Sequence, residues 1–299
     1  MRFEFAPCPP RFFGTVAVRC AFLLAVFGWG AGFYGPSIYL AEVAARTGWP
    51  LTLISAAVTV HFLFGALVAA NLPRLHDRLG LGLTTAAGAL MTAVGVFGWA
   101  TAWQPWQLFV AALLSGAGWV AMGAVAVNAI VARWYATGRP AALARAYNGA
   151  SLGGVIFSPL WVALIHEWGF PIAAAVVGCV MFLIVAVMSH LVFSRTPADF
   201  GLALDGAEAR HHEPARRAAA PAELPRGALW RDRAFLTLAA GMAMGLFAQI
   251  GLLAHLFTLL TPALGAQATG FLVGGGTACA ILGRAAAVRL LAYVNDRRL

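Results

Sequence analysis

The sequence predicts an all-α membrane protein, a helical bundle with about eight transmembrane helices. Hydrophobic residues make up 61% of the chain and charged residues only 10%, whereas soluble domains carry about 25% charged residues. The apolar residues gather in stretches of about 20, long enough at 1.5 Å per residue to cross a hydrocarbon core of about 30 Å. Arginines fall almost entirely into every second gap between these stretches.

The stretches are helices rather than strands because their apolar runs are long and continuous, and lipid admits only helices or closed barrels. In chain order we expect spans at residues 14–40, 51–72, 83–102, 106–132, 146–165, 171–193, 234–258 and 267–291. The first span follows Arg2 and Arg11, as a secretory signal would. It is long, lacks a small-residue cleavage site and is followed by further spans, so we interpret it as the first transmembrane helix.

The gaps between the spans alternate in character. Short turns with few charges are expected on one side, at Arg46–Pro50, Trp103–Trp106, His166–Phe170 and Thr261–Pro262. The other gaps carry arginines, among them Arg74, Arg78, Arg133, Arg139 and Arg145. The positive-inside rule then places both termini and the arginine-bearing gaps in the cytoplasm, with the chain in the inner (plasma) membrane. Tryptophans at 49, 103, 106 and 168 are typical of the outer interface.

The chain divides into two parts at a polar segment. Residues 194–233 are rich in proline, arginine and acidic residues and too polar to bury a core, so we predict a solvated cytoplasmic linker. It separates an N-terminal six-helix half, residues 1–193, from a partial C-terminal half, residues 234–299. An Asp-Arg pair follows the second span (Asp77–Arg78) and again the eighth (Asp296–Arg297), which indicates an internal repeat at an offset of about 220 residues.

Composition and motifs argue against other classes. The arginines that give the chain its net charge of +9 lie at the edges of the membrane spans and are not gathered on one folded surface. We therefore expect no nucleic-acid partner. The cysteines at 8, 20, 179 and 279 are scattered without metal-ligand spacing, so we expect no metal, no cofactor and no disulfide. Without an HExxH or GxSxG motif, the sequence does not favour an enzyme.

Six helices, a polar loop and a restart of the same pattern resemble the major facilitator superfamily. Residues 72–80, LPRLHDRLG, are similar to its loop between helices two and three: Asp77, Arg78 and Gly80 match, while Pro73 stands near the place of the usual first glycine. Other stretches resemble the monocarboxylate transporter and oxalate:formate antiporter branch. They are Gly28–Gly30, Phe33–Gly35, Gly116–Trp119, Arg133–Tyr135, Asn148–Ser151, Pro159–Leu160, Arg195–Gly206 and Gly283–Arg284.

The resemblance implies a major-facilitator-type bundle of twelve helices in two halves around a central cavity. It implies a secondary transporter of small organic anions, monocarboxylates or dicarboxylates, that works by alternating access in the lipid bilayer. Because the chain stops just after Asp296–Arg297, we expect the 299-residue form to lack four helices of the second half and not to catalyse alternating access alone. The alternatives are a non-transporting membrane protein or sensor, and a carrier for another substrate class.

Arg284 is the first candidate site residue because it lies within the eighth span after a run of uncharged residues. A guanidinium in a span must pair or face water, and its fork of donors suits a carboxylate. Physics alone leaves a second interpretation, an arginine that reaches back to the cytoplasmic interface. The resemblance favours the first, since a helix-eight arginine holds the substrate carboxylate in that family.

His61, His255, Tyr34 and Gln249 are further candidates to line the substrate path, because polar groups within spans are costly unless they serve a function or a neighbouring helix. Interhelical hydrogen bonding explains each of them as well. Arg74, Asp77 and Arg78 form a predicted cytoplasmic gating loop, with topogenic charge as the alternative.

No carboxylate lies in the middle of a span, since Glu42 falls at the outer end of the first. Coupling to a proton through histidine, coupling through residues beyond this sequence, and exchange against a counter-anion therefore stay open. The sequence leaves the oligomeric state undetermined.

Overall fold

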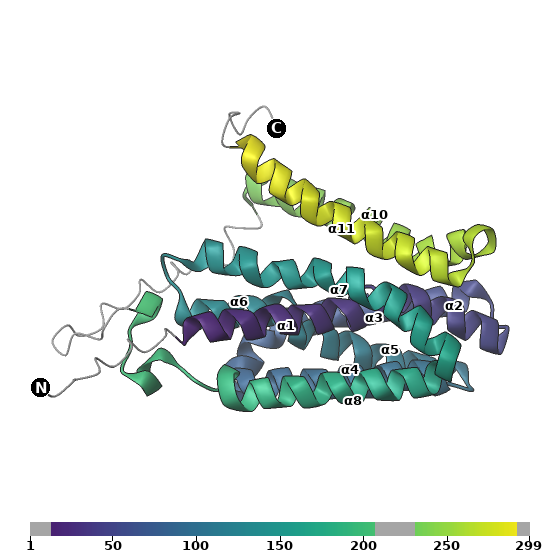
Figure 1. Cartoon of the computed structure of the whole chain (residues 1–299), viewed down its shortest axis with the longest axis horizontal. Coiled ribbons are helices and arrows are strands. Elements are labelled where there is room, and N and C mark those ends of the chain that lie inside the picture. The colour runs from purple at the N-terminus through teal and green to yellow at the C-terminus, as the bar shows by residue number, and fades with distance from the viewer. Residues whose placement is uncertain (1–12, 207–230, 292–299) are drawn as a thin grey trace, which may run out of the picture.

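A computed structural model describes residues 13–206 and 231–291 and confirms the predicted all-α membrane class (Figure 1). Within these residues, 8 helical segments are long and apolar enough to cross a membrane. The first six form a bundle that consists of α1 (Gly14–Gly32), α2 (Gly35–Thr47), α3 (Leu51–Leu79), α4 (Leu81–Thr101), α5 (Pro105–Met122), α6 (Ala124–Trp134), α7 (Arg139–Trp168) and α8 (Phe170–Met188). The other two are α10 (Arg233–Leu264) and α11 (Ala266–Leu291), which lie along one side of the bundle.

The bundle has two distinct ends. The arginine-rich end holds Gly80 between α3 and α4 and the loop 135–138 between α6 and α7. The opposite end holds the tryptophans, of which Trp103, Trp106 and Trp168 are 74%, 64% and 50% exposed. Arg46, the arginine expected on this side, donates to the carbonyls of Ala102 (3.0 Å) and Trp99 (3.2 Å). It therefore satisfies acceptors that the end of α4 leaves open.

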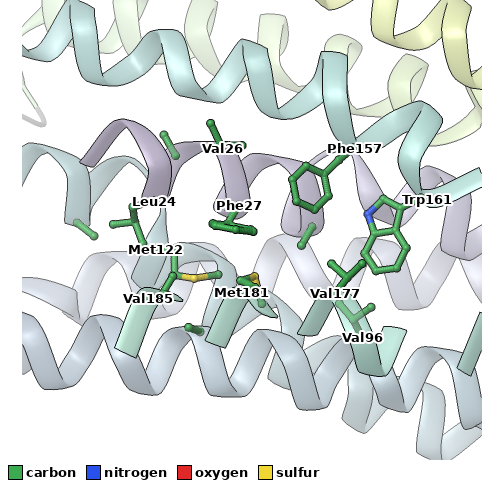
Figure 2. Packing of buried hydrophobic residues seen from close by; sticks show 14 of the residues in the cluster. Leu24, Val26, Phe27, Val96, Met122, Phe157, Trp161, Val177, Met181 and Val185 are labelled. Carbon is green, nitrogen blue, oxygen red and sulfur yellow. The ribbon is translucent and has the colours of Figure 1, made fainter. Parts of the chain in front are cut away.

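Small residues let the bundle helices approach closely. Gly149 and Gly153 of α7 lie against the backbone of α1, where a Cβ at either position would meet the carbonyl of Phe22 or Val26. Between these helices and α8 the core is filled by large side chains: Phe157 of α7 packs edge-on against Phe27 of α1 with ring centroids 5.8 Å apart (Figure 2). Close packing of this kind drives helix association in lipid, where the hydrophobic effect between helices is absent.

Two of the spans consist of two helices each. The first breaks at residues 33 and 34 between α1 and α2, and the fourth breaks at Gly123 between α5 and α6. The first break follows from Pro36, which has no N–H to donate and whose ring disfavours a helical bond at the carbonyl of Gly32. Non-helical backbone at membrane depth is tolerated only where other groups satisfy it.

Two turn predictions are wrong in position. Thr261 and Pro262 lie inside α10, and the chain turns at Gly265, whose φ of +78° favours glycine. Pro262 leaves the carbonyl of Thr258 without its helical donor, and beside it the Thr261 hydroxyl donates to the carbonyl of Phe257 at 2.6 Å. Likewise Arg74, Asp77 and Arg78 occupy the last turns of α3, so the predicted loop is in fact helix, and Gly80 alone separates α3 from α4.

The first part of the predicted linker packs onto the bundle, after a π-helical turn at Ser189–Phe193. Phe200, in the short helix Pro197–Phe200, stacks on Phe13 with ring centroids 4.7 Å apart. Asp205 accepts the backbone N–H groups of Ala136 (3.2 Å), Thr137 (2.8 Å) and Gly138 (3.2 Å) at the start of α7. Residues 207–230 of the predicted linker lie outside the described residues.

Asp205→Ala is expected to destabilise the folded protein by about 1 kcal/mol, as the loss of a helix-capping carboxylate does. The hydrogen bonds from the backbone, that of Thr137 foremost, lower the pKa of Asp205. Because the pKa of Asp205 is lower in the folded protein than in the unfolded chain, the ionised carboxylate stabilises the fold at pH values above about 3.9, the ordinary pKa of aspartate. This stabilisation is lost as the pH falls through the pKa that Asp205 has in the folded protein. The difference in thermal midpoint between wild type and variant should therefore be full at pH 7 and shrink below about pH 4.

Glu167→Ala is the matched control, because Glu167 is an exposed carboxylate whose contact is with exposed His166. It should leave the midpoint unchanged at both pH values. An Asp205→Ala variant as stable as wild type at pH 7 would show that the hydrogen bonds of Asp205 contribute nothing to the stability of the bundle.

The α10–α11 pair contacts the bundle in the half near the tryptophan end. Here α10 packs on α2 and α11 packs on α7, with Gly270 beside Val162 and Gly274 beside Val155. Toward the arginine-rich end the pair leans away from the bundle (Figure 1), and every residue of α10 from 236 to 249 is exposed. The bundle face toward α10 and α11 is thus closed at one end and open at the other.

Candidate site between the two helical segments

Two described cavities lie between the segments, where α2 and α3 face α10. The larger of them, about 470 Å³, separates α3 from α10. Its polar lining comes from Ser55 and Thr59 of α3 and from His255 of α10, and its apolar lining includes Phe62 and Phe247. His255 is therefore placed on a cavity, as its sequence position suggested.

An aromatic group stands beside this cavity at the break of the first span. Phe33 and Phe62 pack on Trp119 of α5 with ring centroids 5.9 Å and 5.4 Å away. The indole N–H of Trp119 is buried without a hydrogen-bond partner in the described residues. Phe33 and Phe62 also line a small neighbouring cavity with Ser37 and Ile250, so this group forms an apolar wall with one unused donor.

Tyr34 lies where three helices meet. It precedes α2, and its ring lies against Gly154 of α7 together with the methyl group of Thr277 of α11. A Cβ added to Gly154 would come within 2.7 Å of both side chains. The glycine therefore makes room for a tyrosine at the contact between the two segments.

His61 has a different position from the one expected of a substrate ligand, because its side chain is buried inside the six-helix bundle. At 1% exposure, it places Nε2 2.9 Å from the carbonyl of Gly32 and Nδ1 2.8 Å from Oγ of Ser115. A carbonyl only accepts, so Nε2 carries the proton and Nδ1 accepts from the serine hydroxyl. Oγ of Ser115 in turn accepts from the indole N–H of Trp99 at 3.1 Å.

This arrangement explains how the break in the first span is stabilised. Three consecutive carbonyls at the end of α1 accept side-chain hydrogen bonds, from Trp161 Nε1 to Gly30 (3.4 Å), from the Tyr39 hydroxyl to Ala31 (3.0 Å) and from His61 Nε2 to Gly32 (2.9 Å). The last of these carbonyls is the one that Pro36 leaves without a helical donor. Both ring nitrogens of His61 are thus used by protein groups, and we assign it a structural role.

Gln249 and Arg284 fall on helices of the second segment. Gln249 is exposed on α10 and is absent from the lining of the cavities described above, although its neighbour Ile250 lines two of them. Arg284 lies within α11, seven residues beyond Thr277, and its side chain lies outside the described residues. Its neighbour Gly283 has open space around it, in keeping with the divergence of α11 from α7.

The predicted gating residues are exposed at the arginine-rich end of α3. Arg74 donates to Oδ1 of Asn71 at 3.0 Å. In the part of the chain that the structure describes, Asp77 forms no ion pair with Arg74 or Arg78. A gating role for these residues stays a prediction.

Another cavity, between α1 and α7, contains residues that the sequence analysis did not select for function. It has a volume of about 380 Å³ and is lined by Thr15, Val18, Arg19 and Phe22 of α1 and by Arg145 of α7. Arg19 had a detectable signal, since it interrupts the apolar run of the first span as Arg284 interrupts the eighth. Arg145 was assigned only to topology.

In the described residues, spans long and apolar enough to cross a membrane, two of them broken, define a polytopic helical membrane protein with cavities against a second helical segment. A family model described as Major Facilitator Superfamily matches residues 20–299, so the chain belongs to this superfamily of membrane transporters. A search among curated proteins found no significant match.

Proposed function

We propose that this major facilitator protein is a secondary transporter of small organic anions that moves them by rocking its two helical segments about a site between them. The observation that carries the substrate class is the sign of the charge within the spans. Arg19 and Arg284 lie within α1 and α11, whereas the carboxylates of the described spans, Glu42, Asp77 and Glu167, all lie near a span end.

Hydrogen-bonding side chains at the larger cavity support this class. His255, Ser55 and Thr59 line that cavity, and the buried Trp119 indole N–H, without a partner in the described residues, lies in the adjacent aromatic wall. An anion in a low-dielectric cavity needs such donors and a cation, because an uncompensated charge there is costly. A cationic substrate would instead need carboxylates that these spans do not supply.

The divergence of α10 and α11 from the bundle fits one transport state, open toward the arginine-rich end. Under the positive-inside rule this end faces the cytoplasm. The unassigned coupling partner is a proton or a counter-anion. His61 is a poor relay because its hydrogen bonds are internal, which leaves His255 as the histidine on a cavity.

Thermal stabilisation of the purified protein by a ligand panel tests the substrate class. Mono- and dicarboxylates should raise the midpoint, because a ligand that binds only the folded state stabilises it by mass action. Sugars and organic cations at the same concentrations and ionic strength are the controls. Stabilisation by cations or sugars without any by carboxylates would replace the organic-anion assignment with another substrate class.

Topology is tested by single-cysteine labelling in intact cells. Thr137 in the loop before α7 and Trp103 between α4 and α5 are exposed or partly exposed at opposite ends of the bundle. Thr137→Cys should resist a membrane-impermeant maleimide and Trp103→Cys should react, because arginine-rich loops stay in the cytoplasm. The reverse labelling pattern would place the open end on the outer side of the membrane and contradict the cytoplasmic assignment.

A further inference from the structure

Helices α4 and α8 pack against each other on the side of the bundle that lies away from α10 and α11 (Figure 1). Gly178 of α8 allows the close contact, since a Cβ at this position would lie 3.0 Å from the Cβ of Ala93. We call this line of contact the α4–α8 seam. Large apolar side chains beside it are exposed and so face lipid, among them Leu83, Val94 and Phe97 of α4 and Val180, Leu183 and Val187 of α8.

A cavity of about 410 Å³ lies at the arginine-rich end of the α4–α8 seam. Its polar lining consists of Arg133, Ser189, His190 and Ser194. The start of α4 here approaches the π-helical turn that follows α8, because a Cβ at Gly82 would lie 2.7 Å from the carbonyl of Ser189. Short π-helical turns are frequent at functional sites.

Arg133 brings a positive charge to this cavity. Its side chain is half-buried, and Nη1 donates to the carbonyl of Phe193 at 2.9 Å, a bond that orients the guanidinium without neutralising it. In the residues that the structure describes, Arg133 forms no ion pair. Asp199 attracts it from a longer distance, and the carboxylate of Asp199 accepts the backbone N–H of Thr196 at 2.8 Å. The cavity is therefore suited to an anion.

The hydroxyl of Ser189 is a second group without a partner. Ser189 is 3% exposed, and within the described part of the chain its Oγ is buried without a hydrogen bond. Buried polar groups are normally hydrogen-bonded, so such an exception needs an explanation. An acceptor oxygen of a ligand in the cavity would supply the missing partner. The exposed imidazole of His190 adds a further hydrogen-bonding group to the lining.

An apolar groove continues the α4–α8 seam toward the tryptophan end. It has a volume of about 240 Å³ and is lined by Leu90 and Phe97 of α4 and by Ala174 and Phe182 of α8, among others. The groove begins about one helical turn beyond the cavity, because Ala86 lines the cavity and Leu90 lines the groove. Phe97 lies about 17 Å along α4 from Ala86, which is close to half of a hydrocarbon core of about 30 Å.

We propose that the α4–α8 seam binds an anionic phospholipid, with the phosphate group beside Arg133 and Ser189 and one acyl chain in the apolar groove. Under the positive-inside rule the lipid belongs to the cytoplasmic leaflet, where basic pockets between spans bind anionic headgroups. A groove of one leaflet's depth that continues from a cationic cavity favours a lipid over a soluble anion, which would leave the groove unused. Because the seam lies away from the cavities between the segments, the proposal does not depend on the transported substrate.

Native mass spectrometry of the delipidated full chain in a neutral detergent tests the site. The probes are phosphatidylglycerol and phosphatidylcholine with identical acyl chains, of which only the first carries a net negative charge. Wild-type protein should bind the first phosphatidylglycerol molecule at least fivefold more tightly than phosphatidylcholine. Arg133→Gln should abolish this preference, and Ser189→Ala should weaken phosphatidylglycerol binding severalfold.

Arg139→Gln is the matched control, because Arg139 is exposed at the same end of the bundle and lines no part of the cavity. It removes the same charge and should leave both lipid affinities unchanged. Glycerol phosphate, which has the anionic group without acyl chains, should not displace the lipid at a hundredfold excess and fixed ionic strength.

Equal phosphatidylglycerol affinity in wild type, Arg133→Gln and Ser189→Ala would overturn the proposal, as would a wild type that binds both lipids equally. Displacement of the lipid by glycerol phosphate would assign the cavity to a soluble anion and overturn it as well. If Arg133→Gln loses its fold together with the bond to Phe193, Ser189→Ala decides the outcome. This variant breaks no hydrogen bond of the Ser189 hydroxyl within the described residues and should keep the thermal midpoint of wild type.

Discussion

Replacement of His61 by leucine is expected to destabilise the folded protein by about 3 kcal/mol, because it leaves the buried carbonyl of Gly32 without a donor. The hydroxyl of Ser115 also loses its 2.8 Å partner and keeps the carbonyl of Ala112 at 3.2 Å. For a chain of this size the loss corresponds to a fall in thermal midpoint of about 5–10 °C. Fluorescence-detected size-exclusion chromatography after heating measures it.

His166→Leu is the control for this experiment, since the His166 side chain is 81% exposed at the tryptophan end and contacts only Glu167. It should leave the midpoint unchanged. A His61→Leu protein as stable as wild type, but with altered carboxylate affinity, would return His61 to the substrate path and contradict the structural role.

Arg284→Lys is expected to weaken carboxylate binding about tenfold or more, although the positive charge is kept. Lysine lacks the planar fork that pairs with both oxygens of a carboxylate, and one hydrogen bond to a charged group contributes about 1.5–3 kcal/mol. Arg284→Ala should lose at least as much. Titration with succinate at fixed ionic strength gives both affinities.

An arginine that merely reaches the interface would tolerate the lysine substitution. Unchanged affinity in both Arg284 variants would therefore remove Arg284 from the site. Arg233→Lys at the start of α10 serves as the control, because it makes the same chemical change at an exposed helix end.

The fold class and the number of spans could be predicted from the sequence because they depend on run length and hydrophobicity, which are local properties. Helix ends were less accurate. Arg74, Asp77 and Arg78 were expected in a loop because they are charged, yet helix α3 continues through them to Leu79. A helix that leaves the hydrocarbon core keeps its backbone bonds, so charge marks the membrane edge and not the helix end.

The site was harder to predict because it depends on which helix face meets which neighbour. His61 and His255 look alike in the sequence, as single histidines in apolar spans. The structure separates them: the Gly32 carbonyl freed by Pro36 engages His61, whereas His255 lines a cavity. Arg145 was attributed to topology, and only the crossing of α1 and α7 brings it to the same cavity as Arg19.

Substrate protection of a cysteine in the cavity is the most direct test of the central claim that carboxylates bind between the two helical segments. Thr59→Cys places a thiol in the lining of the cavity between α3 and α10, and Thr52→Cys places one at the exposed start of α3, at the tryptophan end. Both are made with the natural cysteines replaced by serine, and both are labelled with a neutral maleimide. Saturating succinate should slow the labelling of Thr59→Cys severalfold and leave that of Thr52→Cys unchanged. Equal labelling rates at Thr59→Cys with and without succinate, in protein that succinate demonstrably stabilises, would place the carboxylate site elsewhere.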